Sequence, residues 1–307
     1  MNGILIIDKP AGITSHDVVA RCRRILRTKR IGHTGTLDPF ATGVMVVLVG
    51  QATRLAQFLD KDRKEYEAVV RLGFETDTGD GTGSAKQIPN SRFQIPNSEI
   101  ENALKDFRGE IEQTPPMYSA KKVAGKKLYE LARQGIEIER KPVRVRIYEL
   151  EMLPRENNLE SGIWNLESQT FDFGLRVSCS AGTYIRTLAE DIGKKLETGA
   201  HLAALRRTRA GKFCIKNAAT LDELEQIAAA NKTEEFLIST NEAVSHLPEI
   251  KLSIEDAGKI KNGMRLKTDL PGITDSDFVR LTENGSLIAV GSYDADEKIV
   301  QPKVVLL

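Results

Sequence analysis

Cysteine, histidine and tryptophan are scarce in this 307-residue chain, which has three, four and one of them, respectively. The cysteines Cys22, Cys179 and Cys214 lie far apart and include no CxxC pair, and their odd number argues against a disulfide framework. The histidines are scattered and no HExxH motif occurs, which argues against a zinc site. Because a chain without disulfides is typical of a reducing compartment, we expect a cytoplasmic location.

The sequence also lacks the motifs of common cofactor-dependent and nucleophilic enzymes. It contains no GxxxxGK[ST] and no GxSxG, and GDGTGS at 79–84 does not open a helix after a first strand. No apolar run approaches the roughly 20 residues that a membrane-spanning helix needs. The chain enters the strand-like MNGILIIDKP at once, which leaves no room for a signal or transit peptide. We therefore expect a site made of side chains alone, with no cofactor and no metal.

The net charge is close to zero, because the chain has 44 basic and 43 acidic residues. The basic residues nevertheless gather in three acid-free stretches, RCRRILRTKR (21–30), KKVAGKK (121–127) and RRTRAGK (206–212). Local basic patches on a neutral protein favour a polyanion bound to one face. The alternative for any single patch is a solvated surface, and both interpretations stay open.

Hydrophobic periodicity predicts an α+β fold. Alternating apolar residues predict strands, and apolar residues at a spacing of 3.6 predict amphipathic helices. The predicted strands include 65–74, 142–153 and 171–180, and the predicted helices include 13–28, 97–107 and 183–196. Thr14 or Ser15 is expected to cap the first helix, and Asn97 or Ser98 the second.

The pattern changes near residue 249. From there on, short alternating pieces (FVRLT, LIAVGSY, IVQPKVVLL) are separated by Gly and Asn turns, which predicts a small all-β module of roughly 60 residues. We therefore expect one domain over residues 1–248 and a second over residues 249–307. Two polar segments, 85–98 and 154–162, are expected to be surface elaborations.

The stretch GHTGTLDPFATG (32–43) holds the leading candidate for chemistry, Asp38. Pro39 pushes the backbone of Asp38 toward an extended conformation and offers no N–H for the carboxylate to cap. Glycines on both sides permit a tight path and the close approach of a ligand. An ionised carboxylate there could act as nucleophile or general base, or it could be a turn residue held by Thr34 or Thr36.

Several blocks of the sequence resemble the TruB family of tRNA pseudouridine synthases. GHTGTLDPFATGVMVVLVGQATR resembles the family's aspartate motif, and IIDKPAGITSHDVV its lysine–proline motif. KEYEAVVRLGFETDTGD, PPMYSAKKVAGKKLYELARQG, VSCSAGTYIRTLAEDIG and GAHLAALRRTRAG resemble later blocks in the family's order. The resemblance implies a mixed-sheet catalytic domain that works without cofactor or metal. The β module resembles the PUA-type RNA-binding domain that follows this domain in many members.

The resemblance implies that Asp38 is the catalytic residue of a pocket that takes an extruded uridine. Tyr66 would stack against the base, because aromatic stacking is worth ~1–3 kcal/mol per base; the alternative is a half-buried strand tyrosine. Tyr184 would line the pocket. Arg186 would pair with Asp38 and keep the carboxylate ionised, and a phosphate contact is its alternative role.

Three more residues are implied as substrate-binding. His33 would fill the gap left by the flipped base or stack in the loop, unless it is a hydrogen-bonded structural histidine. Lys9 would shape the pocket floor next to Tyr66, where a structural role is the expected one. Leu205 would lie beneath the uracil, although the sequence alone would make it only a core residue.

The implied reaction is the isomerisation of uridine 55 in the T-loop of tRNA to pseudouridine. The expected partner is the T-arm of tRNA, with no obligate protein partner and no membrane. One alternative is a guide-RNA-dependent synthase of the dyskerin type, whose members usually carry N-terminal extensions, whereas this chain starts at the core motif. Another is a non-catalytic tRNA-binding or tRNA-folding protein. Attack of the aspartate on the ribose and attack on the base are both compatible with the sequence.

Overall fold

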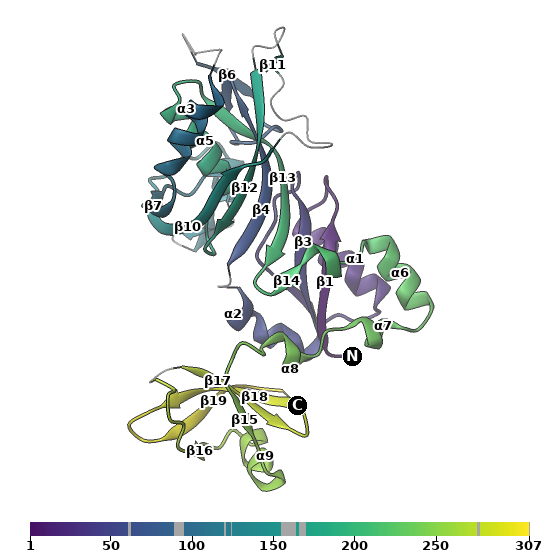
Figure 1. Cartoon of the computed structure of the whole chain (residues 1–307). Helices are drawn as coiled ribbons and strands as arrows, with labels where there is room; N and C mark the ends of the chain where they lie inside the picture. The colour runs from purple at the N-terminus through teal and green to yellow at the C-terminus, as the bar shows by residue number, and fades with distance from the viewer. Residues whose placement is uncertain are drawn as a thin grey trace.

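The computed structural model describes residues 1–60, 63–88, 95–119, 121–123, 125–154, 164–165, 170–274 and 277–306. Ten strands of this part of the chain form one large mixed sheet (Figure 1). Its main path runs β1-β3-β13-β4-β12-β10-β7, with β2 on β3, β11 on β12 and β14 on β13. The strands are β1 (Gly3–Lys9), β2 (Ile31–Thr34), β3 (Thr42–Val49), β4 (Lys64–Leu72), β7 (Gly109–Gln113), β10 (Val143–Met152), β11 (Trp164–Asn165), β12 (Thr170–Cys179), β13 (Ala200–Ala210) and β14 (Phe213–Cys214).

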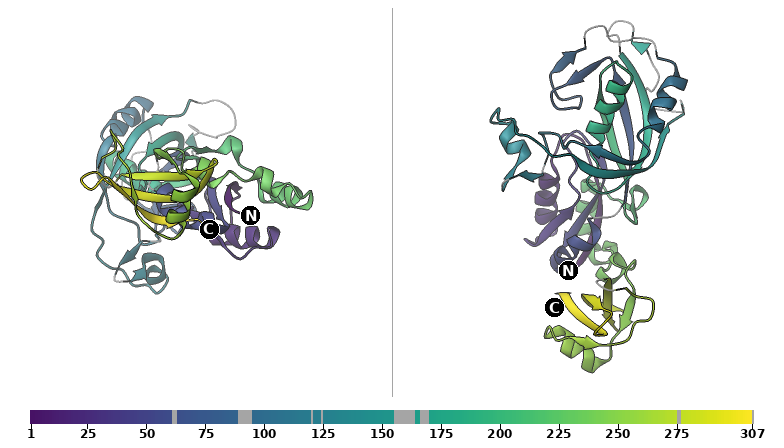
Figure 2. Two further views of the ribbon diagram at one scale, coloured as in Figure 1. Left: turned by 90° about the horizontal axis from the view of Figure 1, so that it is seen from below. Right: turned by 90° about the vertical axis from the view of Figure 1, so that its left-hand side faces the viewer.

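Helices cover different parts of this sheet (Figures 1 and 2). α3 (Asn97–Lys105) and α5 (Ile185–Lys195) pack on the half that contains β4 and β12, whereas α1 (Ser15–Ile25) and α6 (Leu221–Ala229) pack on the half that contains β1 and β3. The shorter helices are η1 (Gly50–Leu55), α2 (Ala56–Leu59), α4 (Leu128–Ala132), η2 (Ile215–Asn217), α7 (Thr233–Phe236) and α8 (Thr240–Ala243). Two small hairpins join β5 (Phe74–Thr76) to β6 (Ala85–Gln87) and β8 (Lys122–Val123) to β9 (Lys126–Lys127). Within the described ranges, no helix is long and apolar enough to cross a membrane.

The predicted periodicities are confirmed in the core. On β4, Tyr66 and the alternate residues Ala68, Val70 and Leu72 are all buried in the cluster that α3 and α5 cover. Thr14 caps α1, since its side chain accepts from the backbone N–H of Asp17, whose carboxylate accepts from the N–H of Thr14 in return. The local sequence therefore sets both the strand faces and the start of the first helix.

The predicted cap of α3 is wrong. Its N-cap residue is Pro96, with no side-chain hydrogen bond, rather than Asn97 or Ser98. Proline is compatible with this position because it has no N–H, and the N–H of an N-cap residue has no acceptor within the helix. Only residues 85–88 and 95–98 of the first polar segment are described, and β6 forms there; the second segment lies outside the described residues except for Pro154.

The two halves of the large sheet meet at a parallel pairing of β3 with β13. Its register pairs Thr42 with Arg206 and Gly43 with Arg207, while the other strand pairs of this sheet are antiparallel. Gly43 has φ +100°, and a Cβ there would lie 2.2 Å from the backbone oxygen of Arg207. Only glycine allows both this conformation and this close approach of the backbones.

A second sheet forms at one end of the molecule, and the two chain termini lie near the junction (Figure 2). Its order is β15-β17-β18-β19-β16, and α9 packs against it. The elements are β15 (Glu249–Lys251), α9 (Ile254–Lys261), β16 (Leu266–Lys267), β17 (Phe278–Glu283), β18 (Ser286–Asp294) and β19 (Ile299–Val305). The predicted small β module is confirmed, with α9 added to it. Leu287, Val290 and Val304 of the module share an apolar cluster with Ile4 and Ile6 of β1.

We expect Gly43→Ala to destabilise the protein far more than Gly12→Ala. Both glycines have positive φ, but a Cβ at Gly12 meets nothing within 4 Å, so that only the left-handed strain of about 1–2 kcal/mol applies there. At Gly43 the Cβ also collides with backbone, and the loss should exceed about 4 kcal/mol. Urea unfolding of both variants measures the difference in stability. Equal losses of stability would contradict the requirement for glycine where β3 pairs with β13.

Candidate active site

The loop that carries Asp38 connects β2 to β3, and it is fixed on both sides of the aspartate. The backbone N–H of Leu37 donates to Ser15 Oγ at 2.9 Å, and Ser15 Oγ donates to the oxygen of Leu37 at 3.1 Å. The oxygen of Pro39 accepts from the N–H of Gly12 at 2.8 Å. Because its two neighbours are held by the start of α1 and the turn before it, the backbone of Asp38 has a defined position.

Lys9 also holds the Asp38 loop in place. Its side chain is fully buried, and its ammonium donates to the oxygens of Pro10, Ile13 and Pro39 at 2.8, 2.7 and 3.1 Å. Burial lowers the pKa of Lys9 to about 8, although the nearby Asp38 opposes this change. Lys9 does not line the cavity beside Asp38, so the structure places it as a support of the loop rather than as a pocket residue.

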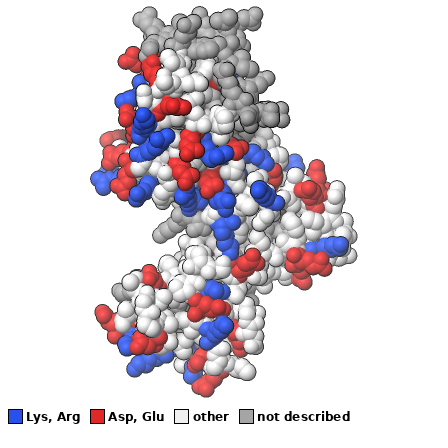
Figure 3. All heavy atoms as spheres, viewed as in Figure 1, with Lys and Arg blue, Asp and Glu red and all other residues white. Residues whose placement is uncertain are grey.

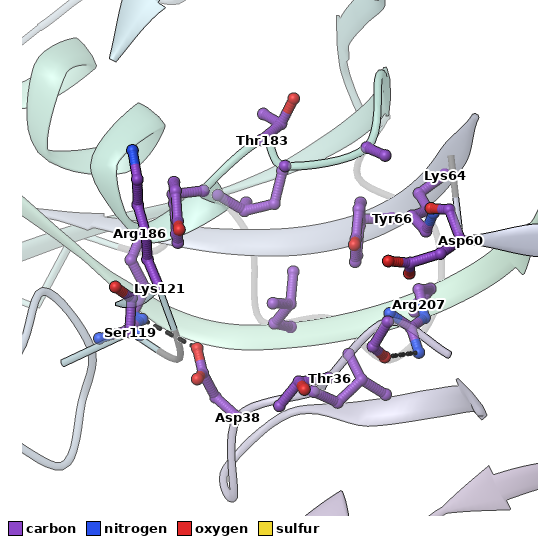
Figure 4. Close-up of a pocket in the computed structure, with 17 residues that line it drawn as sticks. Thr36, Asp38, Asp60, Lys64, Tyr66, Ser119, Lys121, Thr183, Arg186 and Arg207 are labelled. Atoms are coloured by element: carbon purple, nitrogen blue, oxygen red, sulfur yellow. Dashed lines mark hydrogen bonds and ion pairs between the residues drawn. The ribbon is translucent and has the colours of Figure 1, made fainter. Parts of the chain in front are cut away.

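Arg186 pairs with Asp38, as expected (Figure 4). Its Nε lies 2.9 Å from Oδ2 of Asp38. The other guanidinium nitrogens donate to the backbone oxygens of Thr78 at 2.7 Å and Tyr118 at 2.6 Å. Only 6% of the arginine side chain is exposed, compared with 35% of the aspartate side chain. The carboxylate is therefore the more accessible member of the pair, and its cationic partner is almost entirely enclosed by the protein.

The electrostatics of Asp38 reflect opposing influences. Burial raises the pKa of the carboxyl, because the charged form loses hydration, and the carboxylate of Asp80 raises it further. Arg186, through its charge and its hydrogen bond, and Lys9 lower the pKa, but the result remains above the ordinary value of 3.8. The carboxylate is therefore more basic than that of an ordinary aspartate, and Arg186 is the strongest of the influences that favour its ionised form.

The cavity beside Asp38 has a volume of about 270 Å³ and brings together most of the predicted residues (Figure 4). Asp38, Tyr66, Tyr184, Arg186 and Leu205 all line it, although they come from the Asp38 loop, β4, the start of α5 and β13. Burial raises the pKa of both tyrosines, so that their hydroxyls stay protonated. The cavity thus combines two carboxylates, Asp38 and Asp60, with cationic side chains, aromatic rings and an aliphatic side chain.

His33 lies in a neighbouring hollow. This second cavity, of about 330 Å³, is lined by His33, Ala56 and Gln57, and it shares Gly35, Thr36 and Asp60 with the first. The ring of His33 meets that of His16 edge to face at 5.6 Å, and its Nδ1 has no partner among the described residues. Burial, followed by the neighbouring His16, lowers the pKa of His33, so that its ring is neutral.

Arg207, Lys64 and Asp80 are buried charged residues of the site that were not predicted. Arg207 is 1% exposed, and its guanidinium donates to the oxygens of Val44 at 2.7 Å and Gly35 at 2.8 Å, beside the cavity. Asp80 lies 3.7 Å from Arg186 and accepts from the side chain of Thr78 and from the backbone N–H of Thr82. Strand alternation could have indicated that Arg207 points inward where Arg206 points outward.

Some residues of the predicted basic patches form ion pairs within the protein. Arg206 pairs with Asp8 at 2.7 Å and Arg209 with Glu65 at 3.1 Å, which leaves less of the 206–212 stretch for a polyanion. Lys121 of the second stretch lines the cavity. On the face drawn in Figure 3, Lys and Arg atoms run down the centre of the molecule just above the small module, with acidic atoms among them. Within the described part of the chain, no three His, Cys, Asp or Glu side chains are grouped so as to hold a metal ion.

We expect Arg186→Met to raise the pKa of Asp38 further. The substitution removes the charge and hydrogen bond that favour the ionised carboxylate, whereas burial and Asp80 continue to oppose it. Titration of ¹³C-labelled aspartate by NMR measures this pKa, with the resonance assigned from Asp38→Asn. Lys195→Met, which removes an exposed cation paired with Asp106, is the control and should leave the titration unchanged. An Asp38 pKa that falls or stays constant in Arg186→Met would contradict the pairing.

Two family models together match residues 23–245. The model of the TruB family pseudouridylate synthase (N terminal domain) matches residues 23–185, and that of the tRNA pseudouridylate synthase B C-terminal domain matches residues 186–245. The curated tRNA pseudouridine synthase B of Geobacillus thermodenitrificans is 46% identical over 267 residues, which are 87% of this chain and 86% of that protein. The tRNA pseudouridine synthase B of Bacillus cytotoxicus is 45% identical over 308 residues, covering 100% and 98% of the two chains.

Two solved structures also match this chain, at lower sequence identity. A chain in the crystal structure of a Cbf5-Nop10-Gar1 complex matches with a TM-score of 0.73 at 28% identity, covering 99% of this chain and 85% of the other. A chain in an H/ACA RNP bound to a substrate RNA containing 2'-deoxyuridine matches with a TM-score of 0.72 at 27% identity, with the same coverage. From the family models and these relatives, the chain belongs to the TruB family of pseudouridylate synthases.

Proposed function

We propose that this protein is a tRNA pseudouridine synthase that isomerises uridine 55 of the T-loop, with Asp38 as its catalytic residue. The observation that carries the proposal is the Asp38–Arg186 pair, in which a carboxylate is held against a buried guanidinium at the edge of a cavity. Relatives with 45–46% identity over most of the chain are named tRNA pseudouridine synthase B, which supports tRNA as the substrate.

The reaction exchanges one bond of the base for another. The bond between N1 of uracil and C1' of ribose breaks, a bond between C5 and C1' forms, C5 loses its proton, and N1 gains one. The uridine must leave the folded T-loop to reach the enzyme, which costs a few kcal/mol of stacking and pairing. Asp38 supplies the carboxylate either as a nucleophile or as a base, and Arg186 orients it in both cases.

The remaining cavity residues bind and orient the base. We assign the ring of Tyr66 to stacking on the extruded uracil and Leu205 to an apolar contact, with Tyr184 closing the cavity beside Arg186. The protonated hydroxyl of Tyr66 can also donate a hydrogen bond or pass a proton. His33, in the neighbouring hollow, is suited to contact the loop from which the uridine has left, and Lys9 acts through the Asp38 loop.

We further propose that residues 1–248 form the catalytic domain and residues 249–307 a PUA-like RNA-binding domain. The second sheet starts at Glu249 and has its own apolar core, which supports this division. The module also shares an apolar cluster with β1, so that RNA bound by both parts would be held in a fixed orientation to the cavity. We expect the protein to act on the T-arm without a protein partner, in the cytoplasm where tRNA is modified.

A guide-RNA-dependent activity of the dyskerin type has less support. The matching chains of the H/ACA RNP and of the Cbf5-Nop10-Gar1 complex are 27% and 28% identical to this chain, whereas the relatives named tRNA pseudouridine synthase B reach 45–46%. A non-catalytic tRNA-binding role would not require the buried arginine behind an aspartate that opens on a cavity.

We expect Asp38→Asn to bind tRNA almost normally and to convert no uridine. Asparagine keeps the shape and can still accept from Arg186, but it has no charge and is a poor nucleophile; most of the affinity comes from phosphate contacts and stacking. Single-turnover conversion of a T-arm RNA, with enzyme in excess, measures the chemistry, and filter binding of the same sample measures affinity.

The matched control is Asp106→Asn, which removes an aspartate from an exposed ion pair with Lys195. Exposed pairs contribute roughly 0–1 kcal/mol, so this variant should keep full turnover. If Asp38 were only a turn residue, its replacement would cost about 1–2 kcal/mol of stability and turnover would survive. Appreciable turnover by folded Asp38→Asn would exclude the proposed role of this residue.

A further inference from the structure

The helix that carries Arg186 begins without a capping side chain of its own. Tyr184 is the N-cap residue of α5, and its backbone oxygen accepts the first helical hydrogen bond, from Leu188, at 3.1 Å. No side-chain cap hydrogen bond is made by Tyr184. Helix starts usually need such a partner, because their first N–H groups lack intrahelical acceptors.

Gln113, the last residue of β7, instead hydrogen-bonds the backbone of this N-cap residue from a distant part of the chain. The N–H of Tyr184 donates to Oε1 of Gln113 at 2.9 Å, and Nε2 of Gln113 donates to the oxygen of Tyr184 at 3.2 Å. The glutamine is 1% exposed. One primary amide thus satisfies a donor and an acceptor of the same residue, and only one orientation of that amide does so.

The sequence after Gln113 explains why a side chain takes this role. Pro115 and Pro116 have no N–H groups, so β7 cannot extend as a paired strand toward the start of α5. Two contacts join the segments instead, namely the Gln113 amide on Tyr184 and the oxygen of Tyr118 on Arg186. The first turn of α5 is therefore held at two points against residues 113–118.

Both residues that this contact holds belong to the candidate active site. Tyr184 lines the cavity, and Arg186, two residues later, pairs with Asp38 at 2.9 Å. Gln113 is not among the described residues that line the cavity, so it acts only through the backbone of Tyr184. A small shift or rotation of the first turn would move the guanidinium from Asp38, and displacements of about 1 Å are known to cost roughly 100-fold in rate.

We propose that Gln113 is a positioning residue for the pseudouridine synthase reaction: its side-chain amide fixes the start of α5 and thereby aligns Tyr184 and Arg186 with Asp38. The inference rests on the proposed function for its kinetic consequence, and on geometry alone for its structural one. Gln113 would then affect the reaction rate although it is buried and contacts neither the substrate nor Asp38.

The test compares Gln113→Met with Thr198→Val. Methionine matches the length of glutamine but offers no donor or acceptor to Tyr184. Thr198 is also 1% exposed, and its hydroxyl donates to the oxygen of Gly193 near the other end of α5, so that its loss perturbs the same helix away from the cavity. Thermal unfolding of both variants establishes how much stability each has lost.

Single-turnover conversion of a T-arm RNA should slow roughly 10- to 100-fold in Gln113→Met, with the Kd for the RNA within about threefold of the original protein. Thr198→Val should keep the original rate. An activity-independent readout is the NMR titration of Asp38, whose pKa should rise in Gln113→Met, as in Arg186→Met, and stay constant in Thr198→Val. If the original protein converts no uridine, the proposed function fails while this titration still tests the positioning.

Equal rates and equal Asp38 titrations in the two variants would overturn the inference, because Gln113 would then only stabilise the fold. If Gln113→Met does not fold, Gln113→Asn replaces it, since asparagine keeps a polar amide but is too short to reach both groups of Tyr184. A folded Gln113→Asn protein with the original rate and the original Asp38 pKa would equally overturn it.

Discussion

The guanidinium of Arg186 is the point at which the active-site segments meet. It is buried and contacts four oxygen acceptors, Asp38 Oδ2, the backbone oxygens of Thr78 and Tyr118, and at longer range Asp80 Oδ2. A buried charge is costly unless it is paired and hydrogen-bonded. The loop, the turn and the segment that provide these acceptors must therefore come together around the arginine, and the arrangement of the cavity follows from that requirement.

Such a buried pair is weak evidence for stability, because desolvation offsets much of the attraction. Its value lies in preorganisation, since a charge that is already oriented needs no rearrangement during the reaction. The supports behind the pair have the same effect. Lys9 and Ser15 hold the loop of Asp38, and Gln113 holds the helix of Arg186. The positions of the charged side chains that line the cavity thus depend on residues that do not line it.

Local rules predicted the parts of this structure that depend on near neighbours in the sequence. The faces of β4, the Thr14 cap of α1 and the small β module follow from periodicity and capping chemistry. Residues that act across the fold were not predictable in the same way. The sequence does not indicate a role for Asp80, because its contact with Arg186 exists only after the turn meets α5.

The candidate site shows the same division. Family resemblance predicted the meeting of Asp38 and Arg186, which are 148 positions apart and which no spacing rule could have paired. The 206–212 stretch predicts a basic surface patch that includes Arg207, because a run of basic residues hides the alternation that buries one of them. Gln113 carried no signal at all, since a single glutamine before two prolines has no motif.

We propose that this chain alone, through its side chains, moves the glycosidic bond of one uridine from N1 to C5. The most direct measurement uses a T-arm RNA that carries tritium only at C5 of the T-loop uridine, because that hydrogen must leave when C5 joins the ribose. The purified protein is added in buffer with a chelator and without guide RNA or other proteins. We expect stoichiometric release of tritium into water, which would support the proposed function. Release that appears only after a guide RNA or a partner protein is added, or no release at all, would contradict it.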